Sequence, residues 1–353
     1  LFRSKFLREP FCTKPWTELS YTTNGVRPCC VWHGEKYQGN LSEYKSSKYI
    51  KRIKKAMIDH NMDFLNKSCF DCIDNEKQNL YSPRQARQAR HLELFEYWPS
   101  NICNLKCIMC SADNSNLIEE EEINLGLRQP VEKHITDISK FDFENVKILR
   151  VYGGEPTAGV HTFQQLKSVA DRGYAKNITL AYTTNATSYN KIWTNIANQF
   201  AETDVGISVD GTGKVFEYIR QNAKWNKVEE NIFKIINDAT NYSFSIVLQT
   251  TSFILVDKWI DFFFQFPTNN IGMYQLYDVP GRLTAIPNNI KQRLINKLEK
   301  KNHELANKII NILQNTEFDV KELKAYKDYV LMLDSRRGTN ILELDPIFEE
   351  LIK

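Results

Sequence analysis

Three closely spaced cysteines are the residues in this sequence best suited to chemistry. Residues 100–110 read SNICNLKCIMC, so Cys103, Cys107 and Cys110 follow a CxxxCxxC spacing. Three thiolates on one short loop can each bind an iron of a [4Fe–4S] cubane, and no fourth cysteine follows at a matching distance. One iron would then keep an open position for a chelating ligand. The alternative is a zinc site completed by a distant fourth ligand.

The remaining five cysteines all precede this loop, at Cys12, Cys29, Cys30, Cys69 and Cys72. A secreted disulfide framework is normally a small, cysteine-dense domain. Here tight groups of thiols are followed by a long remainder that contains no cysteine. We therefore expect metal ligands rather than disulfide bonds.

Strands that alternate with helices should position the cysteine loop, which follows the first of them. Such βαβ units give parallel strands and right-handed crossovers, and functional groups in parallel α/β barrels gather at the carboxyl ends of the strands. The expected strands are 92–98, 147–152, 178–184, 204–210, 244–250 and 272–278. The expected helices between them are roughly 113–125, 160–172, 189–200, 227–240 and 256–265.

We predict three regions along the chain. Residues 1–88 are mostly irregular, and metal binding would supply part of their folding energy. Residues 89–285 are predicted to form an α/β, partial (β/α)6 barrel. Residues 286–353, which are rich in Lys, Glu, Leu and Ile, are predicted to be a helical C-terminal extension.

Short motifs stand where three of the expected strands end. Residues 152–156 read YGGEP after the second strand, residues 183–185 read TTN after the third, and residues 208–211 read SVDG after the fourth. Glycines let the backbone approach a ligand closely, and Glu155 offers a negative partner for an ammonium group. The alternatives are a simple turn, an aspartate that caps a helix and, at Arg220, a surface arginine.

A CxxxCxxC loop after the first strand, followed by GGEP, resembles the radical S-adenosylmethionine (SAM) superfamily. The resemblance implies a [4Fe–4S] cluster on Cys103, Cys107 and Cys110 whose open iron binds SAM. The cluster then delivers an electron that splits SAM into methionine and a 5′-deoxyadenosyl radical, which abstracts hydrogen. Two positions depart from the family pattern: Ala186 replaces a glycine after Asn185, and Met109 replaces the more common aromatic residue.

The resemblance also implies which residues contact SAM. The GGEP segment would line its amino group, Ser208 and Asp210 would reach the ribose hydroxyls or the substrate, and Arg220 would pair with the carboxylate. Asp210 is in addition a candidate catalytic residue. The implied cofactor-binding residues are Met109, Gly153, Gly154, Glu155, Thr184, Asn185, Ser208, Asp210 and Arg220.

The N-terminal cysteines resemble the auxiliary-cluster domains called SPASM and twitch, in which a cysteine, a glycine turn and a cysteine precede a CxxC pair. The resemblance implies a second [4Fe–4S] cluster, although in many relatives that domain follows the barrel. Its implied ligands are Cys12, Cys30, Cys69 and Cys72. A zinc ribbon is the alternative. Cys29 is the spare thiol, with three possible roles: an alternate ligand, a packed core thiol or a catalytic hydrogen-atom donor.

The expected function is hydrogen abstraction from a substrate C–H bond, followed by oxidation or cross-linking of a peptide or protein. The alternatives are a radical epimerase and a dehydrogenase of a small molecule such as an aminosugar. A non-catalytic iron–sulfur or zinc scaffold, or an electron carrier, is the alternative from another class. A reductant such as flavodoxin or ferredoxin is the expected partner.

The net charge and the hydropathy of the sequence indicate no further partner. The 46 Lys and Arg against 43 Asp and Glu give a formal charge of +3, so no nucleic-acid partner is expected. No run approaches the roughly 18 apolar residues that a membrane helix requires, and we expect a cytoplasmic protein. The most basic stretch, residues 45–55 (KSSKYIKRIKK), is expected to form the solvent-exposed face of an amphipathic helix, with phosphate contact as the alternative.

Overall fold

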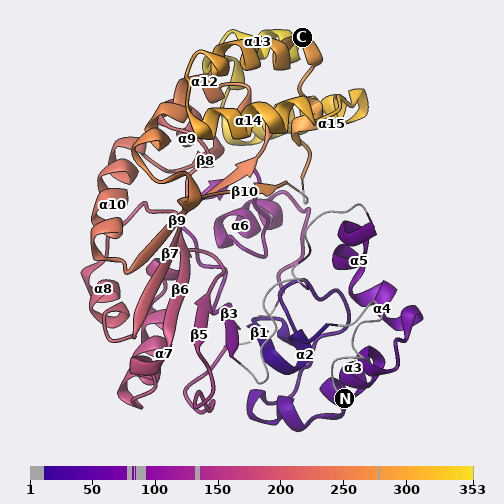
Figure 1. Cartoon of the computed structure of the whole chain (residues 1–353), viewed down its shortest axis with the longest axis vertical. Coiled ribbons are helices and arrows are strands. Elements are labelled where there is room, and N and C mark those ends of the chain that lie inside the picture. The colour runs from indigo at the N-terminus through magenta and orange to yellow at the C-terminus, as the bar shows by residue number, and fades with distance from the viewer. Residues whose placement is uncertain are drawn as a thin grey trace. The chain divides into compact units, whose positions relative to one another are not determined.

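The computed structural model describes residues 12–77, 82, 84, 93–131, 136–276 and 279–352. The chain divides into two compact units. The first unit takes in residues 1–102, 129–182 and 190–203, and the second takes in 103–128, 183–189 and 204–353. Figure 1 labels the helices and strands.

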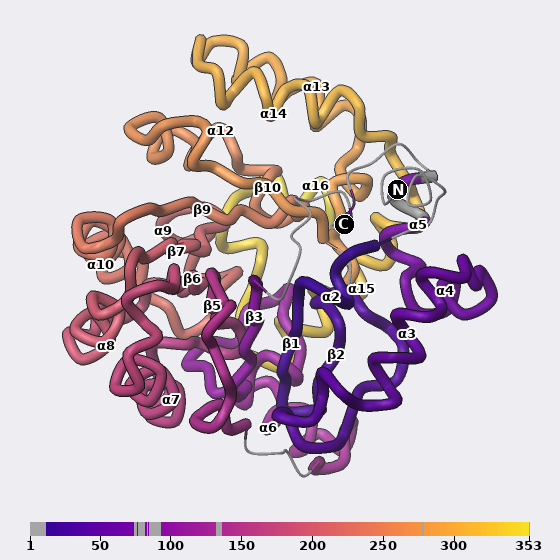
Figure 2. The backbone as a smooth tube through the Cα atoms, turned by 60° about the horizontal axis from the view of Figure 1, so that its bottom comes forward, coloured from indigo at the N-terminus to yellow at the C-terminus, as the bar shows by residue number. Residues whose placement is uncertain are grey.

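The first unit contains a sheet with the strand order β2-β1-β3-β5-β6. All neighbours are parallel except β1 and β2, which form a hairpin. Figure 2 shows β5, β3, β1 and β2 following one another across the sheet. The strands are β1 (Glu18–Thr22), β2 (Gly25–Arg27), β3 (Leu94–Tyr97), β5 (Ile148–Val151) and β6 (Thr179–Thr184).

Alternation along these strands separates an apolar face from a polar one. Leu19, Phe95, Leu149 and Leu180 are paired in register across four strands, and each is at most 1% exposed. The row that alternates with them is polar and contains Ser20, Glu96 and Arg150. The apolar row forms the core of this unit.

The helices of the first unit precede and follow the hairpin in the sequence. They are α2 (Lys14–Thr17), η1 (Leu41–Ser46), α3 (Lys48–Ile58), α4 (Met62–Ser68), α5 (Phe70–Lys77), η3 (Pro156–Ala158), α7 (Val160–Asp171), η4 (Ala175–Asn177) and α8 (Lys191–Ala197). Ser47 caps α3, because its side chain accepts a hydrogen bond from the Ile50 amide. The buried face of α3 contains Ile50, Ile53 and Met57, so its basic residues form the exposed side, as predicted.

The second unit contains the parallel strands β7 (Glu202–Ser208), β9 (Asn241–Leu248) and β10 (Ile271–Gln275), in that order. A separate two-stranded ladder pairs β4 (Lys106–Cys107) with β8 (Arg220–Gln221). The helices near these strands are α6 (Asn116–Asn124), α9 (Gly213–Ile219), α10 (Trp225–Asp238), α11 (Thr250–Phe253), α12 (Val256–Trp259), η5 (Ile260–Gln265) and η6 (Thr268–Asn270).

The C-terminal part of the second unit is helical, as predicted for residues 286–353. Its elements are η7 (Leu283–Ala285), α13 (Asn288–Glu299), α14 (Glu304–Gln314), α15 (Val320–Arg337), η8 (Ile341–Glu343) and α16 (Ile347–Ile352). In α14 the buried residues Leu305, Ile309 and Leu313 recur at helical spacing. These helices pack along that apolar stripe.

The predicted α/β class, with mostly parallel strands separated by helices, is confirmed. The predicted strands at 92–98 and 272–278 are found as β3 and β10, and positions 92, 277 and 278 lie outside the described residues. The hairpin β1–β2 was not predicted, and it brings the N-terminal residues into the sheet of the first unit. Among the described residues, no helix combines the length and apolar character needed to cross a membrane.

Candidate active site

The cysteine loop is held in place by the backbone and by distant side chains. β4 lies in the middle of the loop and pairs Cys107 with Arg220 of β8. The amide of Cys103 donates to Asn116 Oδ1 at 2.8 Å, and the Tyr329 hydroxyl donates to the Ile108 carbonyl at 2.5 Å. In the described part of the chain, none of the three loop cysteines forms a disulfide bond.

An ion-pair network supports the same loop. Glu121 of α6 accepts from Lys106 at 2.9 Å and from Arg337 of α15 at 2.9 Å. Arg337 also donates to the Lys106 carbonyl at 2.8 Å. Burial raises the pKa of the Cys110 thiol to about 12, and the nearby Arg220 and Arg337 oppose this rise. Arg220 and Arg337 thus favour the thiolate form that an iron ligand requires, whereas burial and Cys107 disfavour it.

A buried ion pair stands against the loop. Asp210 is fully buried and Arg220 is 8% exposed. The Arg220 Nε and Nη2 atoms lie 2.9 and 2.7 Å from Asp210 Oδ2, and the Val247 amide donates to Oδ1 at 2.7 Å. Arg220 Nη1 lies 3.9 Å from Cys107 Sγ. Burial would lower the pKa of Arg220, but Asp210 and the thiol raise it.

Two residues predicted to contact SAM separately are thus bonded to each other. Arg220 was expected to pair with the SAM carboxylate and Asp210 to reach the ribose or the substrate. Their mutual pairing puts one guanidinium edge on the carboxylate and another beside Cys107. The arrangement places a cation next to the Cys107 thiol.

The segment after β6 is joined to the cysteine loop. Asn185 Nδ2 donates to Asn104 Oδ1 at 3.0 Å, and Asn104 Nδ2 donates to Thr187 Oγ1 at 2.8 Å. Ala186 has a φ of 55°, in the left-handed region that favours glycine. Its amide donates to Thr184 Oγ1 at 3.1 Å, and its carbonyl accepts from Asn231 at 3.0 Å. These hydrogen bonds stabilise the left-handed backbone of Ala186, at the position where the family pattern has glycine.

The GGEP segment lies in the first unit, where it contacts the end of the residue 98–102 segment. Gly153 and Gly154 have φ values of 81° and 54°. A Cβ on Gly154 would lie 2.0 Å from the Ile102 carbonyl oxygen, so only glycine fits there. Glu155 is 2% exposed, its amide donates to that carbonyl at 2.7 Å, and its carboxylate caps η3 by accepting from Thr157.

Replacing Gly154 by alanine should destabilise the protein more than the same change at Gly173. Both glycines have a positive φ, but an added Cβ at Gly173 meets nothing within 4 Å. We expect Gly173→Ala to cost about 1–2 kcal/mol from backbone strain alone. Gly154→Ala should cost at least about 3 kcal/mol, because the Ile102 carbonyl must also move. Urea unfolding measures both, and equal losses would show that the close approach is absent.

Residues 98–258 match the family model described as the radical SAM superfamily. The chain carries a radical SAM domain. The matched range contains the cysteine loop, the GGEP segment, Asp210 and Arg220, so the predicted resemblance to this superfamily is confirmed. A domain of this superfamily implies a [4Fe–4S] cluster and SAM as cofactors. The match begins after the five N-terminal cysteines, so the SPASM or twitch domain stays a prediction.

Known proteins are similar to this chain only distantly. An uncharacterized protein of Methanocaldococcus jannaschii is 26% identical over 208 residues, which are 56% of this chain and 68% of the relative. The solved structure of anSMEcpe with bound AdoMet is 17% identical with a TM-score of 0.43, covering 67% of this chain and 65% of that one. SuiB of Streptococcus suis bound to the precursor peptide SuiA is 13% identical with a TM-score of 0.36, covering 94% and 71%. The chain thus spans slightly less than two thirds of the anSMEcpe chain.

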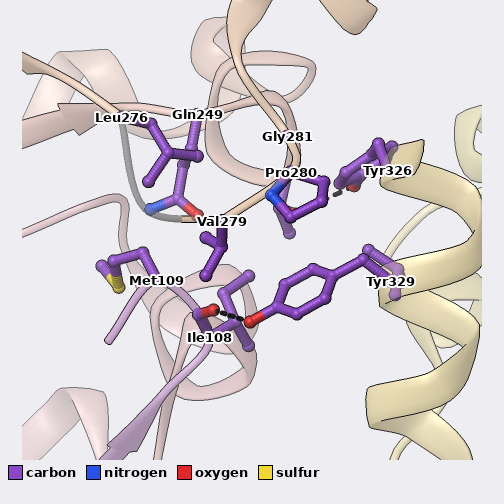
Figure 3. A pocket seen from close by; sticks show the side chains of 11 residues that line it. Ile108, Met109, Gln249, Leu276, Val279, Pro280, Gly281, Tyr326 and Tyr329 are labelled. Carbon is purple, nitrogen blue, oxygen red and sulfur yellow. Dashed lines mark hydrogen bonds between the residues drawn. The ribbon is translucent and has the colours of Figure 1, made fainter. Parts of the chain in front are cut away.

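A small pocket lies beside the loop of the radical SAM domain (Figure 3). Met109 lines it together with Gln249, Leu276, Tyr326 and Tyr329. Met109, one of the implied cofactor-binding residues, therefore borders a pocket between the loop and α15. Gln249 is 2% exposed, and its Nε2 has no hydrogen-bond partner among the described residues.

Several of these contacts were not predicted from the sequence. Tyr329 and Arg337 lie on α15, more than 200 residues from the loop that they contact. Neither belongs to a motif, and a helical extension was all that the pattern there indicated. Asn116 and Asn104 lie near the cysteines, but a single asparagine carries no recognisable signal.

A second group of cysteines lines a pocket in the first unit. Cys12, Cys29, Cys69 and Cys72 lie around it, together with the cations Lys14 and Arg84. Lys14 is paired with Glu18, and Arg84 with Glu76. Four thiols with two adjacent cations fit the donor set of an iron–sulfur cluster. Among the described residues, no three His, Cys, Asp or Glu side chains are grouped to hold a single metal ion.

Cys29, rather than its neighbour Cys30, shares that pocket. Burial raises the pKa of Cys29 well above its usual value, with further rises from Cys30, Cys12 and Cys69. Burial raises the pKa of Cys30 to about 12; Glu96 and Glu18 raise it further, and Lys14 lowers it. The ligand set expected from the sequence contained Cys30, whereas the pocket presents Cys29 beside the other three thiols.

Proposed function

We propose that this protein cleaves SAM reductively and uses the resulting radical to abstract hydrogen from a substrate C–H bond. The cluster on Cys103, Cys107 and Cys110 would bind SAM through its open iron and supply the electron. The observation that carries the proposal is a three-cysteine loop, braced by Arg220 and Arg337, inside residues that match the radical SAM superfamily.

The residues of the chain have three tasks in this proposal. The β4–β8 ladder, Asn116 and Tyr329 fix the backbone of the loop that carries the three thiols. Arg220 and the Arg337 network offset negative charge on the thiolates. Burial of Cys107 and of the Asp210–Arg220 pair keeps water away from the ligand atoms.

SAM cleavage is tested with anaerobically reconstituted protein. Dithionite and SAM are added, and 5′-deoxyadenosine is measured by chromatography. The proposal predicts 5′-deoxyadenosine that depends on both the reductant and the cluster. A non-catalytic scaffold or electron carrier would form none, even when it is fully loaded with iron.

We also propose a second cluster, held by Cys12, Cys29, Cys69 and Cys72. The shared pocket supports this ligand set, and Lys14 and Arg84 would balance its negative charge. Oxidation or cross-linking removes a second electron from the substrate, so an acceptor site suits this chemistry. An oxidised or cross-linked peptide is the proposed product class, and flavodoxin or ferredoxin the proposed reductant.

Serine substitutions at the adjacent thiols should separate the two possible ligand sets. Cys29→Ser should lower the iron content by up to about four atoms per chain, because one ligand of a cubane is lost. Cys30→Ser should leave the content near about eight, the sum of two cubanes. Iron and sulfide are measured after anaerobic reconstitution. If Cys30→Ser lost iron and Cys29→Ser did not, Cys30 would be the ligand, as expected from the sequence.

A further inference from the structure

A cavity of about 650 Å³, which includes open solvent, lies in the first unit, and no cysteine lines it. It is bordered by α2, β1, η1 and α3, and Pro15 lines both this cavity and the cysteine pocket. Nothing in the proposed chemistry uses it. Its lining residues are Pro15, Trp16, Glu18, Leu19, Tyr44, Lys45, Ile50, Lys54 and Asn145.

Two lysines line this cavity, Lys45 of η1 and Lys54 of α3. Among the described residues, neither Lys45 nor Lys54 forms an ion pair, whereas their neighbours Arg52 and Lys55 are paired with Glu35 and Asp59. The Lys45 ammonium lies 5.1 Å from the ring centre of Phe141, and that of Lys54 lies 5.5 Å from Trp16. Aromatic faces stabilise a cation but leave its charge uncompensated.

The two ammonium groups also act on each other. Burial lowers the pKa of Lys54, and the charge of Lys45 lowers it further. Burial lowers the pKa of Lys45 as well, with partial compensation from Asp142. An anion between the two lysines would relieve both effects, because it replaces lost solvation and screens the repulsion.

The other walls indicate what kind of anion would fit. Tyr44 is 2% exposed, and its buried hydroxyl has no hydrogen-bond partner among the described residues. Glu18 also lines the cavity, and although Lys14 pairs with it, its second oxygen is unpartnered. That carboxylate disfavours a dianion. Trp16, Leu19 and Ile50 supply apolar surface for an organic body.

We propose that this cavity binds an organic carboxylate, with Lys45 and Lys54 contacting the carboxylate and Trp16 packing against its apolar body. The carboxylate can come from an acidic side chain of a peptide or from a small organic acid. This inference goes beyond SAM cleavage and does not depend on it. Lys45 and Lys54, near the two ends of the basic stretch 45–55, would then bind the carboxylate, while the exposed residues between them face solvent.

Calorimetric titration of the reconstituted full chain tests the site. The probes are an acetylated and amidated Leu-Asp-Leu peptide, its Leu-Asn-Leu counterpart, 4-methylpentanoate and inorganic phosphate. We expect at least one of the two carboxylates to bind at least about tenfold more tightly than the neutral peptide, because the neutral peptide carries no charge that could pair with the lysines. Tighter binding of the Leu-Asp-Leu peptide identifies a peptide source, and tighter binding of 4-methylpentanoate a small acid.

Variants assign the binding to this cavity. Lys45→Gln/Lys54→Gln should weaken carboxylate binding about tenfold. The control, Lys48→Gln/Lys51→Gln, removes two exposed charges of α3 that do not line the cavity and should have little effect. Equal loss in both variants, no carboxylate binding, or preferential phosphate binding would overturn the proposal. Formation of 5′-deoxyadenosine should be the same in all variants, which separates this test from that of SAM cleavage.

Discussion

Replacement of Cys107 by serine is expected to abolish the formation of 5′-deoxyadenosine from SAM. Cys107 is the buried member of the loop, lies in β4 and faces the guanidinium of Arg220 at 3.9 Å. Its loss removes one of the three thiolates that would bind the cluster, and up to about four irons per chain should go with it. Chromatography of the nucleoside and an iron assay on the same sample measure both effects.

The matched control for this change is Cys30→Ser. Cys30 lies outside both groups of thiols that the structure brings together, so SAM cleavage and iron content should stay at the level of the unchanged protein. Full activity in Cys107→Ser would mean that the loop does not hold the catalytic cluster. Circular dichroism of the variant shows whether the α/β fold is kept.

Replacement of Arg220 by methionine is expected to cost about 3–5 kcal/mol of stability, because it leaves the fully buried carboxylate of Asp210 without its cation. Urea unfolding of the reconstituted protein measures the loss. The second change Asp210→Asn, made on the Arg220→Met background, should recover part of it, since the neutral amide no longer needs a counterion.

An exposed ion pair of the same unit provides the comparison. Lys234 pairs with Glu230 on α10, where both side chains are largely exposed. Lys234→Met should therefore change the stability by less than about 1 kcal/mol. If Arg220→Met were no more destabilising than Lys234→Met, the buried pair would not have the role inferred from its geometry.

The elements and motifs predicted from the sequence were those that depend on local patterns. The helical C-terminal region and six strands follow from apolar periodicity; the strands are β3, β5, β6, β7, β9 and β10. The cysteine loop and the GGEP segment follow from fixed spacing, and the lack of room for a Cβ at Gly154 explains why glycine stands there. These features need only a few adjacent residues to be recognised.

Contacts between distant parts of the chain could not be predicted in this way. Arg337 reaches Glu121 and the Lys106 carbonyl from α15, and no periodic pattern specifies such a contact. The pairing of Asp210 with Arg220 was also missed, because each residue was assigned to SAM on its own. The β1–β2 hairpin is short and lies between proline- and glycine-containing segments, which indicate irregular structure.

The choice between Cys29 and Cys30 shows the same limit at the scale of one residue. Spacing alone allows either thiol to complete a set with Cys12, Cys69 and Cys72. The backbone after β2 turns Cys29 toward the pocket of those thiols and leaves Cys30 under the influence of Glu96. Only the three-dimensional course of the chain distinguishes the two.

The central claim is that Cys103, Cys107 and Cys110 hold a four-iron cluster with one iron open to SAM. A crystal structure of the anaerobically reconstituted protein with SAM, with anomalous data at the iron and zinc edges, tests it most directly. The account predicts iron at this loop, three cysteine ligands, and SAM on the fourth iron. A zinc ion at the loop, or a fourth protein side chain on the cluster, would contradict it.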